Sequence, residues 1–148
     1  MKPMPSFTPM WKVAIASMVV VAGHVVTLPF VYVMLLIPFM EHGSHGVGVE
    51  PSWVGHLAVY ADAVVLSAIA GSILGNSKGV RASHGLAAGI LTGLVRAGIH
   101  YGTEILRGYP PDHLCDVLPD VGLCLLAFGP VMLFFSARAA RKRDLYLC

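Results

Sequence analysis

Four long apolar segments, separated by shorter polar stretches, set the pattern of this chain. They lie at residues 11–40, 54–74, 83–106 and 121–140. A helix needs roughly 20 predominantly apolar residues to cross the hydrocarbon core of a bilayer, and each segment has that length. The pattern therefore predicts an all-α integral membrane protein, in which residues 1–148 form a single domain built as a four-transmembrane-helix bundle.

The composition agrees with a membrane protein. Of the 148 residues, 56% are hydrophobic and only 12% are charged, whereas roughly 25% are charged in an average soluble domain. The net charge of +2 is small, and the basic residues form no face of the kind that binds nucleic acid. The expected partners are therefore the lipid bilayer and either a larger membrane complex or further copies of the chain, and not nucleic acid.

Basic residues indicate which side of the membrane each connection faces. They gather before the first segment, between the second and third segments, and in the C-terminal tail: Lys2, Lys12, Lys78, Arg81, Arg138, Arg141, Lys142 and Arg143. Connections rich in lysine and arginine stay in the cytoplasm. We therefore expect the bacterial inner membrane, with both termini cytoplasmic and residues 41–53 and 107–120 on the periplasmic side.

The third segment carries a line of ionisable side chains. Arg96, His100 and Glu104 follow one another at intervals of four residues, which places them on one side of a helix. Ionisable groups at membrane depth are costly and usually face protein, a cavity or a ligand. Glycines that continue the stripe allow another helix to pack closely or leave room for a flat ligand: Gly85, Gly89 and Gly93.

Asp62 of the second segment is the expected partner of Arg96. With a rise of about 1.5 Å per residue, the two lie at similar depth on consecutive helices, which are expected to pack antiparallel. We predict a buried Asp62–Arg96 ion pair, because either charge alone would be costly in hydrocarbon. The pair serves either as a lock between helices or as part of a site. Glu104 belongs either to that site or to an interfacial pair with Arg107.

Histidines complete the predicted polar cavity, which opens outward. His24 lies midway along the first segment on a face shared with Ser17, Val20 and Thr27, and we expect that face to turn inward. His56 lies at the outer end of the second segment. The cofactor-binding candidates are His24, His56, His100 and Arg96. The catalytic candidates are His100, Glu104, Asp62 and Arg96.

The outer connections carry a separate set of candidate metal ligands. His42 and His45 lie in one connection and His113 in the other, each near acidic residues. Imidazole and carboxylate groups bind Zn²⁺ or Cu²⁺. These residues therefore predict a metal site at the outer face, although their glycine-rich surroundings imply no fixed geometry.

Three classes of function fit these residues. The leading expectation is a redox subunit of a larger electron-transfer complex, holding haem b between two histidines or a quinone near a histidine, an arginine and a carboxylate. The second is a proton-coupled transporter or channel for a small solute or metal, because Asp62, Arg96, His100 and Glu104 are suited to a proton relay. The third is a membrane-embedded enzyme or an accessory subunit that packs in a larger complex.

Overall fold

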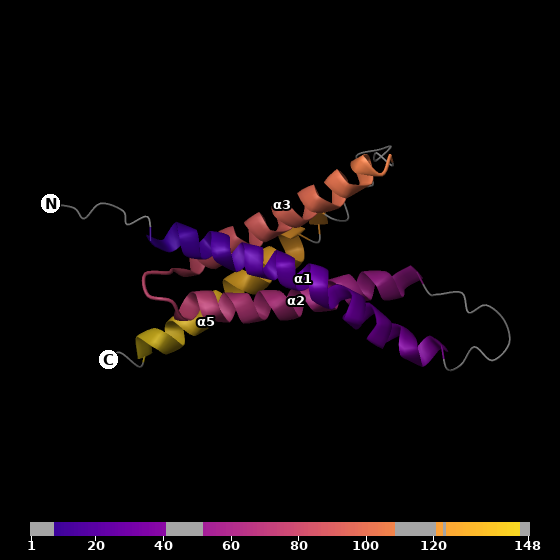
Figure 1. The fold of residues 1–148 in the computed structure, drawn as a ribbon. Helices are drawn as coiled ribbons and strands as arrows, with labels where there is room; N and C mark the ends of the chain where they lie inside the picture. The colour runs from indigo at the N-terminus through magenta and orange to yellow at the C-terminus, as the bar shows by residue number, and fades with distance from the viewer. Residues whose placement is uncertain (1–7, 41–51, 109–120, 123, 146–148) are drawn as a thin grey trace.

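The computed structural model describes residues 8–40, 52–108, 121–122 and 124–145, and these residues form helices and turns without strands. The helices are α1 (Thr8–Met40), α2 (Ser52–Asn76), α3 (Ala82–Leu106), the π-helical turn η1 (Cys124–Phe128) and α5 (Gly129–Leu145) (Figure 1). The apolar segments are therefore confirmed as helices over their described parts. The first three begin and end within a few residues of the predicted bounds, whereas α5 continues beyond residue 140.

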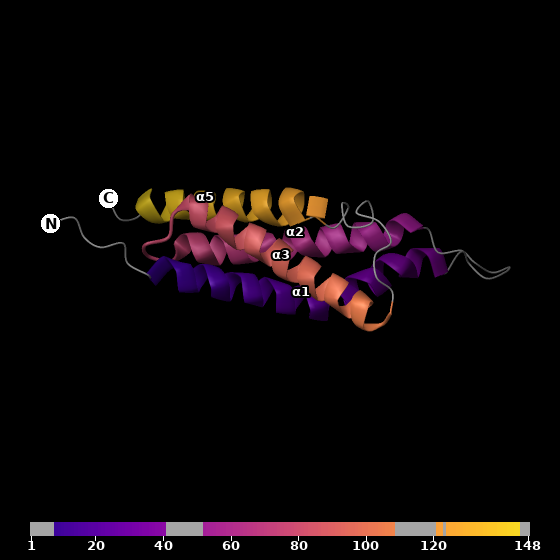
Figure 2. The same ribbon diagram turned by 90° about the horizontal axis from the view of Figure 1, so that it is seen from above.

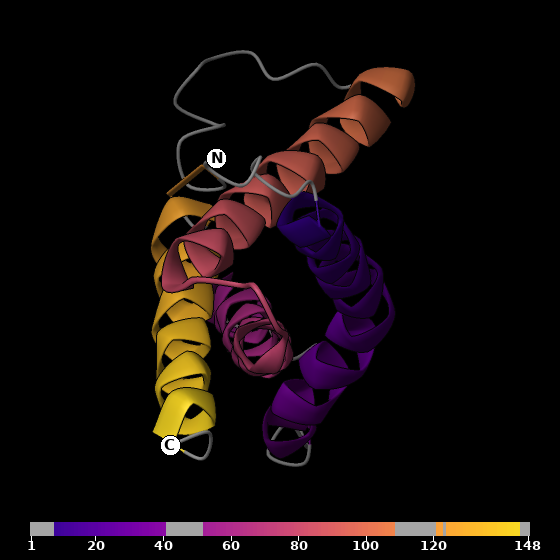
Figure 3. The same cartoon turned by 90° about the vertical axis from the view of Figure 1, so that its left-hand side faces the viewer.

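The helices form a ring in which each packs mainly against two others. α2 packs between α1 and α5, and α3 packs against the same two helices, crossing over them (Figures 2 and 3). α2 and α3 touch little and lie at opposite corners, although only residues 77–81 separate them in the chain. The start of α1, the α2–α3 turn and the end of α5 lie at one end of the bundle (Figure 1).

Glycines allow α5 to approach α2 at backbone distance. A Cβ atom added at Gly71 would lie 2.9 Å from the carbonyl oxygen of Met132, closer than Cβ atoms come to other atoms in proteins. Gly75 meets the backbone of Ser136 even more tightly. Because no side chain fits at either position, the two helices pack through their main chains.

The glycine stripe of α3 is also covered by α5. A Cβ atom at Gly89 would lie 2.5 Å from the carbonyl oxygen of Phe128, and one at Gly85 would collide with the side chain of Ser136. Of the two uses expected for this stripe, close helix packing is therefore confirmed at Gly85 and Gly89. The space in front of these two glycines holds a helix.

The C-terminal end of α2 is capped by cations from other helices. α2 has no basic residue in its own last turn. Arg143 of α5 donates through Nη1 to the carbonyl oxygens of Ser77 (2.7 Å) and Gly75 (3.3 Å). Lys12 of α1 donates through Nζ to the carbonyl oxygen of Lys78 (2.9 Å). Cations at this position satisfy carbonyl groups and complement the helix dipole, and they tie three helices together.

The π-helical turn η1 precedes Pro130 of α5. Proline lacks an N–H group, and its ring clashes with the carbonyl group four residues earlier, so a regular α-helix does not continue unchanged through it. The wider π turn accommodates this interruption. It ends at Phe128, whose side chain is completely buried in the core.

Two of the helices are long and apolar enough to cross a membrane. Judged by length and composition, the candidate spans are Met10–Ile37 in α1 and Val54–Asn76 in α2. The described chain is therefore an all-helical bundle with two candidate membrane spans.

Substitution of Gly89 should loosen the bundle. In Gly89→Ala the added Cβ pushes against the backbone of Phe128, and overpacking of this kind costs about 1–3 kcal/mol. The matched control is Gly98→Ala in the same helix, where nothing lies within 4 Å of the added Cβ. Unfolding in detergent, followed by circular dichroism, should show a loss of stability for Gly89→Ala alone. Equal stability of the two variants would contradict the close α3–α5 packing.

Candidate functional site

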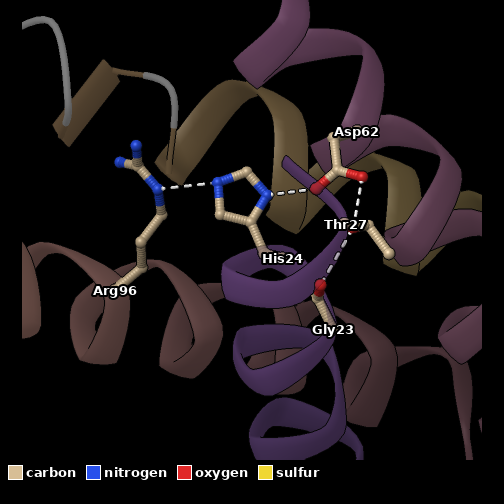
Figure 4. A network of polar contacts seen from close by, with 5 residues as sticks. All are labelled: Gly23, His24, Thr27, Asp62 and Arg96. Atoms are coloured by element: carbon tan, nitrogen blue, oxygen red, sulfur yellow. Dashed lines mark hydrogen bonds and ion pairs between the residues drawn. The ribbon is translucent and has the colours of Figure 1, made fainter. Parts of the chain in front are cut away.

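His24, Asp62 and Arg96 form a line of hydrogen bonds across three helices (Figure 4). Nδ1 of His24 on α1 lies 2.6 Å from Oδ2 of Asp62 on α2. Nε of Arg96 on α3 donates to Nε2 of His24 over 3.2 Å. His24 is only 3% exposed and Asp62 only 5%. The imidazole therefore connects the buried carboxyl group of Asp62 to the partly buried guanidinium group of Arg96.

This arrangement corrects the expected direct pair between Asp62 and Arg96. That expectation assumed that α2 and α3 pack side by side because a short turn joins them. They lie instead at opposite corners of the ring, and α1 contacts both. Within the described part of the chain, the side chain of Asp62 bonds to His24 and Thr27. The acid and the base therefore meet through His24.

The partners of His24 determine which of its nitrogens carries the proton. A guanidinium group only donates hydrogen bonds, so Nε2 of His24 accepts from Arg96 and is unprotonated. Nδ1 then carries the proton and donates to Asp62. This assignment follows from the neighbours, and it makes His24 a neutral imidazole with both ring nitrogens in use.

Thr27 holds the second carboxylate oxygen of Asp62. Its Oγ1 lies 2.6 Å from Oδ1 of Asp62 and 2.9 Å from the carbonyl oxygen of Gly23 (Figure 4). A hydroxyl group has one proton to donate. When Asp62 is ionised, Thr27 donates to it. When Oδ1 is protonated, Asp62 donates to Thr27, and Thr27 donates to Gly23. Both arrangements of the Thr27 hydroxyl group keep its hydrogen bond to Asp62.

Phe128 closes the network on the side of α5. Its ring meets the His24 ring edge-on, with ring centroids 6.0 Å apart and an interplanar angle of 84°. The π turn before Pro130 places this ring, and no spacing rule applied to the sequence identified it. The available signal was Pro130 itself, because a proline inside an apolar segment marks an irregular turn just before it.

The inward face predicted for α1 is confirmed. Ser17, Val20 and His24 are each at most 3% exposed. Ser17 Oγ donates to the carbonyl oxygen of Ala88 on α3 over 2.8 Å. Thr27 completes this face through its bond to Asp62. The three-, four- and seven-residue spacings of α1 thus locate the helix face that carries the site.

A cavity of about 190 Å³ lies beside the network, between α1 and α3. Its lining combines apolar side chains of both helices with a few polar groups: Val21, His24, Val25, Leu28, Arg96, Ile99, His100 and Thr103. Apolar walls with a small number of convergent polar groups are typical of small-molecule sites. We call this space the α1–α3 cavity.

Other predicted site residues lie elsewhere. Glu104 pairs with Arg107, with 3.6 Å between Oε1 and Nη1, which is the interfacial alternative. His56 is exposed on α2 and is absent from the lining of the α1–α3 cavity. Within the described ranges, no group of three or more potential metal-ligand side chains comes together. The candidate metal ligands of the outer connections fall outside the described residues: His42, His45 and His113.

The interpretation of this site rests on its geometry, because comparisons with known proteins found no match. No protein-family model matches the chain, and no curated protein and no solved structure matches it. The fold and the site define the class: an all-helical bundle with two candidate membrane spans and a buried acid–imidazole–guanidinium network beside a cavity.

Removal of the Asp62 carboxylate should weaken the packing of α1 on α2. In Asp62→Val the buried Nδ1–H of His24 loses its acceptor, and a buried unsatisfied group costs about 1–3 kcal/mol. Ser67→Ala is the matched control on the same helix. Oγ of Ser67 is buried and has no partner within the described residues, so its loss should leave stability unchanged or improve it.

The measurement is the free energy of unfolding of both variants in the same detergent. If Asp62→Val is as stable as Ser67→Ala, the network does not hold the helices together.

Proposed function

We propose that this chain is a small membrane subunit that binds the head group of a quinone in the α1–α3 cavity. One observation carries the proposal. Arg96 and His100 line the same apolar-walled cavity as His24, and His24 bonds directly to a carboxyl group whose network accommodates one added proton. Hydrogen-bond donors and a nearby proton store are what quinone chemistry requires.

Large apolar side chains on the outer surface support a membrane setting. On α1, Phe30 is 69% exposed and Met34 is 73% exposed, and Leu94 on α3 is 64% exposed. Exposure to water costs roughly 25 cal/mol per Å² of apolar surface, whereas lipid chains remove that cost. The proposal places four helices across the bacterial inner membrane, with the basic end of the bundle in the cytoplasm.

The walls of the cavity suit the two parts of a quinone. The head group has two carbonyl oxygens, which accept hydrogen bonds from donors such as Arg96 and His100. The isoprenoid tail prefers an apolar path, and Val25, Leu28 and Ile99 provide one at the same cavity. The polar residues therefore orient the head group while the tail extends into lipid.

The proton balance of quinone reduction gives the buried network a role. Conversion of a quinone to a quinol takes up two electrons and two protons and forms an O–H bond at each carbonyl oxygen. In the proposal, a redox subunit of a larger electron-transfer complex supplies the electrons. The two protons come from water at the periplasmic end of the bundle, and His100, about two turns from that end of α3, lines the cavity. Asp62 stores a proton inside the bundle in the arrangement in which it donates to Thr27, while His24 keeps its bonds to Asp62 and Arg96.

The geometry favours a quinone over haem b. Haem iron binds a nitrogen lone pair of histidine, and both nitrogens of His24 already have partners. His56 and His100 belong to α2 and α3, which lie at opposite corners of the ring. The space at Gly85 and Gly89, where a flat macrocycle was an option, is filled by α5.

Proton-coupled transport is the second candidate function. It is favoured by the two hydrogen-bond arrangements available to Thr27, which allow Asp62 to gain and lose a proton within an intact network. Buried carboxyl groups in membrane helices frequently serve proton relays. In this alternative the α1–α3 cavity takes up the transported solute, and the purified protein holds no quinone.

Quinone binding should depend on His100. Titration of the detergent-purified protein with a short-chain benzoquinone, followed by calorimetry, gives the dissociation constant. His100→Ala should weaken binding about fivefold, because a lost hydrogen bond to the ligand is worth on the order of 1 kcal/mol. His56→Ala is the matched control, since His56 is also an exposed histidine but lies outside the cavity.

Two results would contradict the quinone proposal. Equal affinity of wild type and His100→Ala for the benzoquinone would show that the quinone does not bind in the α1–α3 cavity. A Soret band in the oxidised protein, with α and β bands after reduction by dithionite, would show haem b instead. A colourless protein that yields quinone on organic extraction is the expected result.

A further inference from the structure

The C-terminal half of α5 borders a second cavity, far along the helix from the His24 network. It has a volume of about 430 Å³. Its lining joins three cations to apolar side chains: Phe134, Ala137, Arg138, Arg141, Lys142 and Leu145. Among the described residues, no acidic side chain lines it. A concave surface lined by positive charges concentrates anions.

These cations differ from the neighbouring Arg143 because none of them has an acidic partner among the described residues. Arg143 is bound by Asp144 and by the end of α2. Within the described ranges, neither an ion pair nor a hydrogen bond engages the side chains of Arg138, Arg141 and Lys142. Their charges therefore remain available to an external anion.

The cation cluster is accessible from two sides of α5. A cavity of about 210 Å³ lies between α5 and α2, and Arg138 and Lys142 line it as well as the larger one. Because residues four apart share one side of a helix, these two cations form a ridge between the cavities. Asn76 adds an amide group on the α2 side.

We infer that this surface binds the head group of an anionic phospholipid. The apolar part of the lining favours a lipid over a free phosphate ion. Phe134 is 59% exposed and packs edge-on against Phe135. It lies about 6 Å along the helix from Arg138, at about 1.5 Å per residue, toward the middle of the bundle. A phosphate held by the cations thus places its acyl chains beside Phe134.

The cation cluster lies at the end of a helix, where the anionic head groups of a membrane are expected to lie. Anionic head groups attract lysine and arginine residues that lie next to a membrane helix. The inference rests on the membrane setting of the proposed function but not on its quinone, so a failure of quinone binding leaves the inference standing. Loss of lipid binding with unchanged quinone affinity separates the two.

The test compares two variants of equal net charge. Arg138→Gln/Arg141→Gln/Lys142→Gln removes the three cations of the cavity. Lys78→Gln/Arg81→Gln/Arg107→Gln removes three from elsewhere on the described surface. Each changes the formal net charge from +2 by −3, to −1. Native mass spectrometry of the detergent-purified proteins then measures binding of phosphatidylglycerol, with phosphatidylcholine as the neutral lipid.

Wild type and the second variant should bind phosphatidylglycerol in preference to phosphatidylcholine. The first variant should bind phosphatidylglycerol at least about tenfold more weakly. Equal weakening in both variants would overturn the inference, because total charge would then govern binding. Thermal stabilisation by inorganic phosphate equal to that by phosphatidylglycerol would also overturn it, since the site would then need no acyl chain.

A single-residue comparison covers the case in which the triple variant does not fold. Lys142→Gln removes one cation of the cavity ridge, and Lys78→Gln removes an exposed lysine near the same end of the bundle. Only Lys142→Gln should weaken phosphatidylglycerol binding. Equal binding by the two single variants and wild type would contradict the inference.

Discussion

The hydrogen-bonded line from Asp62 through His24 to Arg96 is the constraint on which the bundle depends. A buried carboxylate or guanidinium group is costly unless it is paired and hydrogen-bonded. Here one neutral imidazole satisfies both, because it donates through Nδ1 and accepts through Nε2. Three helices must therefore meet at one level, with α1 between the two that carry the charges. The second oxygen of Asp62 is held by the same helix, through Thr27.

The packing of α5 supports this line without adding a charge to it. Glycines on α2 and α3 bring its backbone close to both helices, while the π turn before Pro130 directs Phe128 against His24. At the far end, Arg143 and Lys12 satisfy carbonyl groups at the end of α2. Hence α5 supports the network at one end and closes the bundle at the other.

The two proposed ligand sites lie at different levels of the bundle, and the polar groups at each level determine which ligand fits. Near the network, one cavity combines apolar walls with Arg96, His24 and His100, which suits a small ligand that accepts hydrogen bonds and exchanges protons. At the basic end, cations that have no acidic partner among the described residues stand over apolar walls, which suits a lipid with an anionic head group. Both sites are open to the bilayer in the proposed setting, so their ligands are expected to arrive through lipid.

The sequence by itself determined the helices and the inward face of α1. Apolar runs set the helix bounds, and the spacing of Ser17, Val20 and His24 located the buried face, because both properties depend on neighbours along one chain. Tertiary structure decided which side chains meet. α3 crosses over both of its neighbours (Figures 2 and 3). One side of this helix therefore meets α5 at Gly85 and Gly89 and lines the cavity beside α1 with Arg96 and His100. The order of helices around the ring, which no local pattern encodes, placed His24 between Asp62 and Arg96.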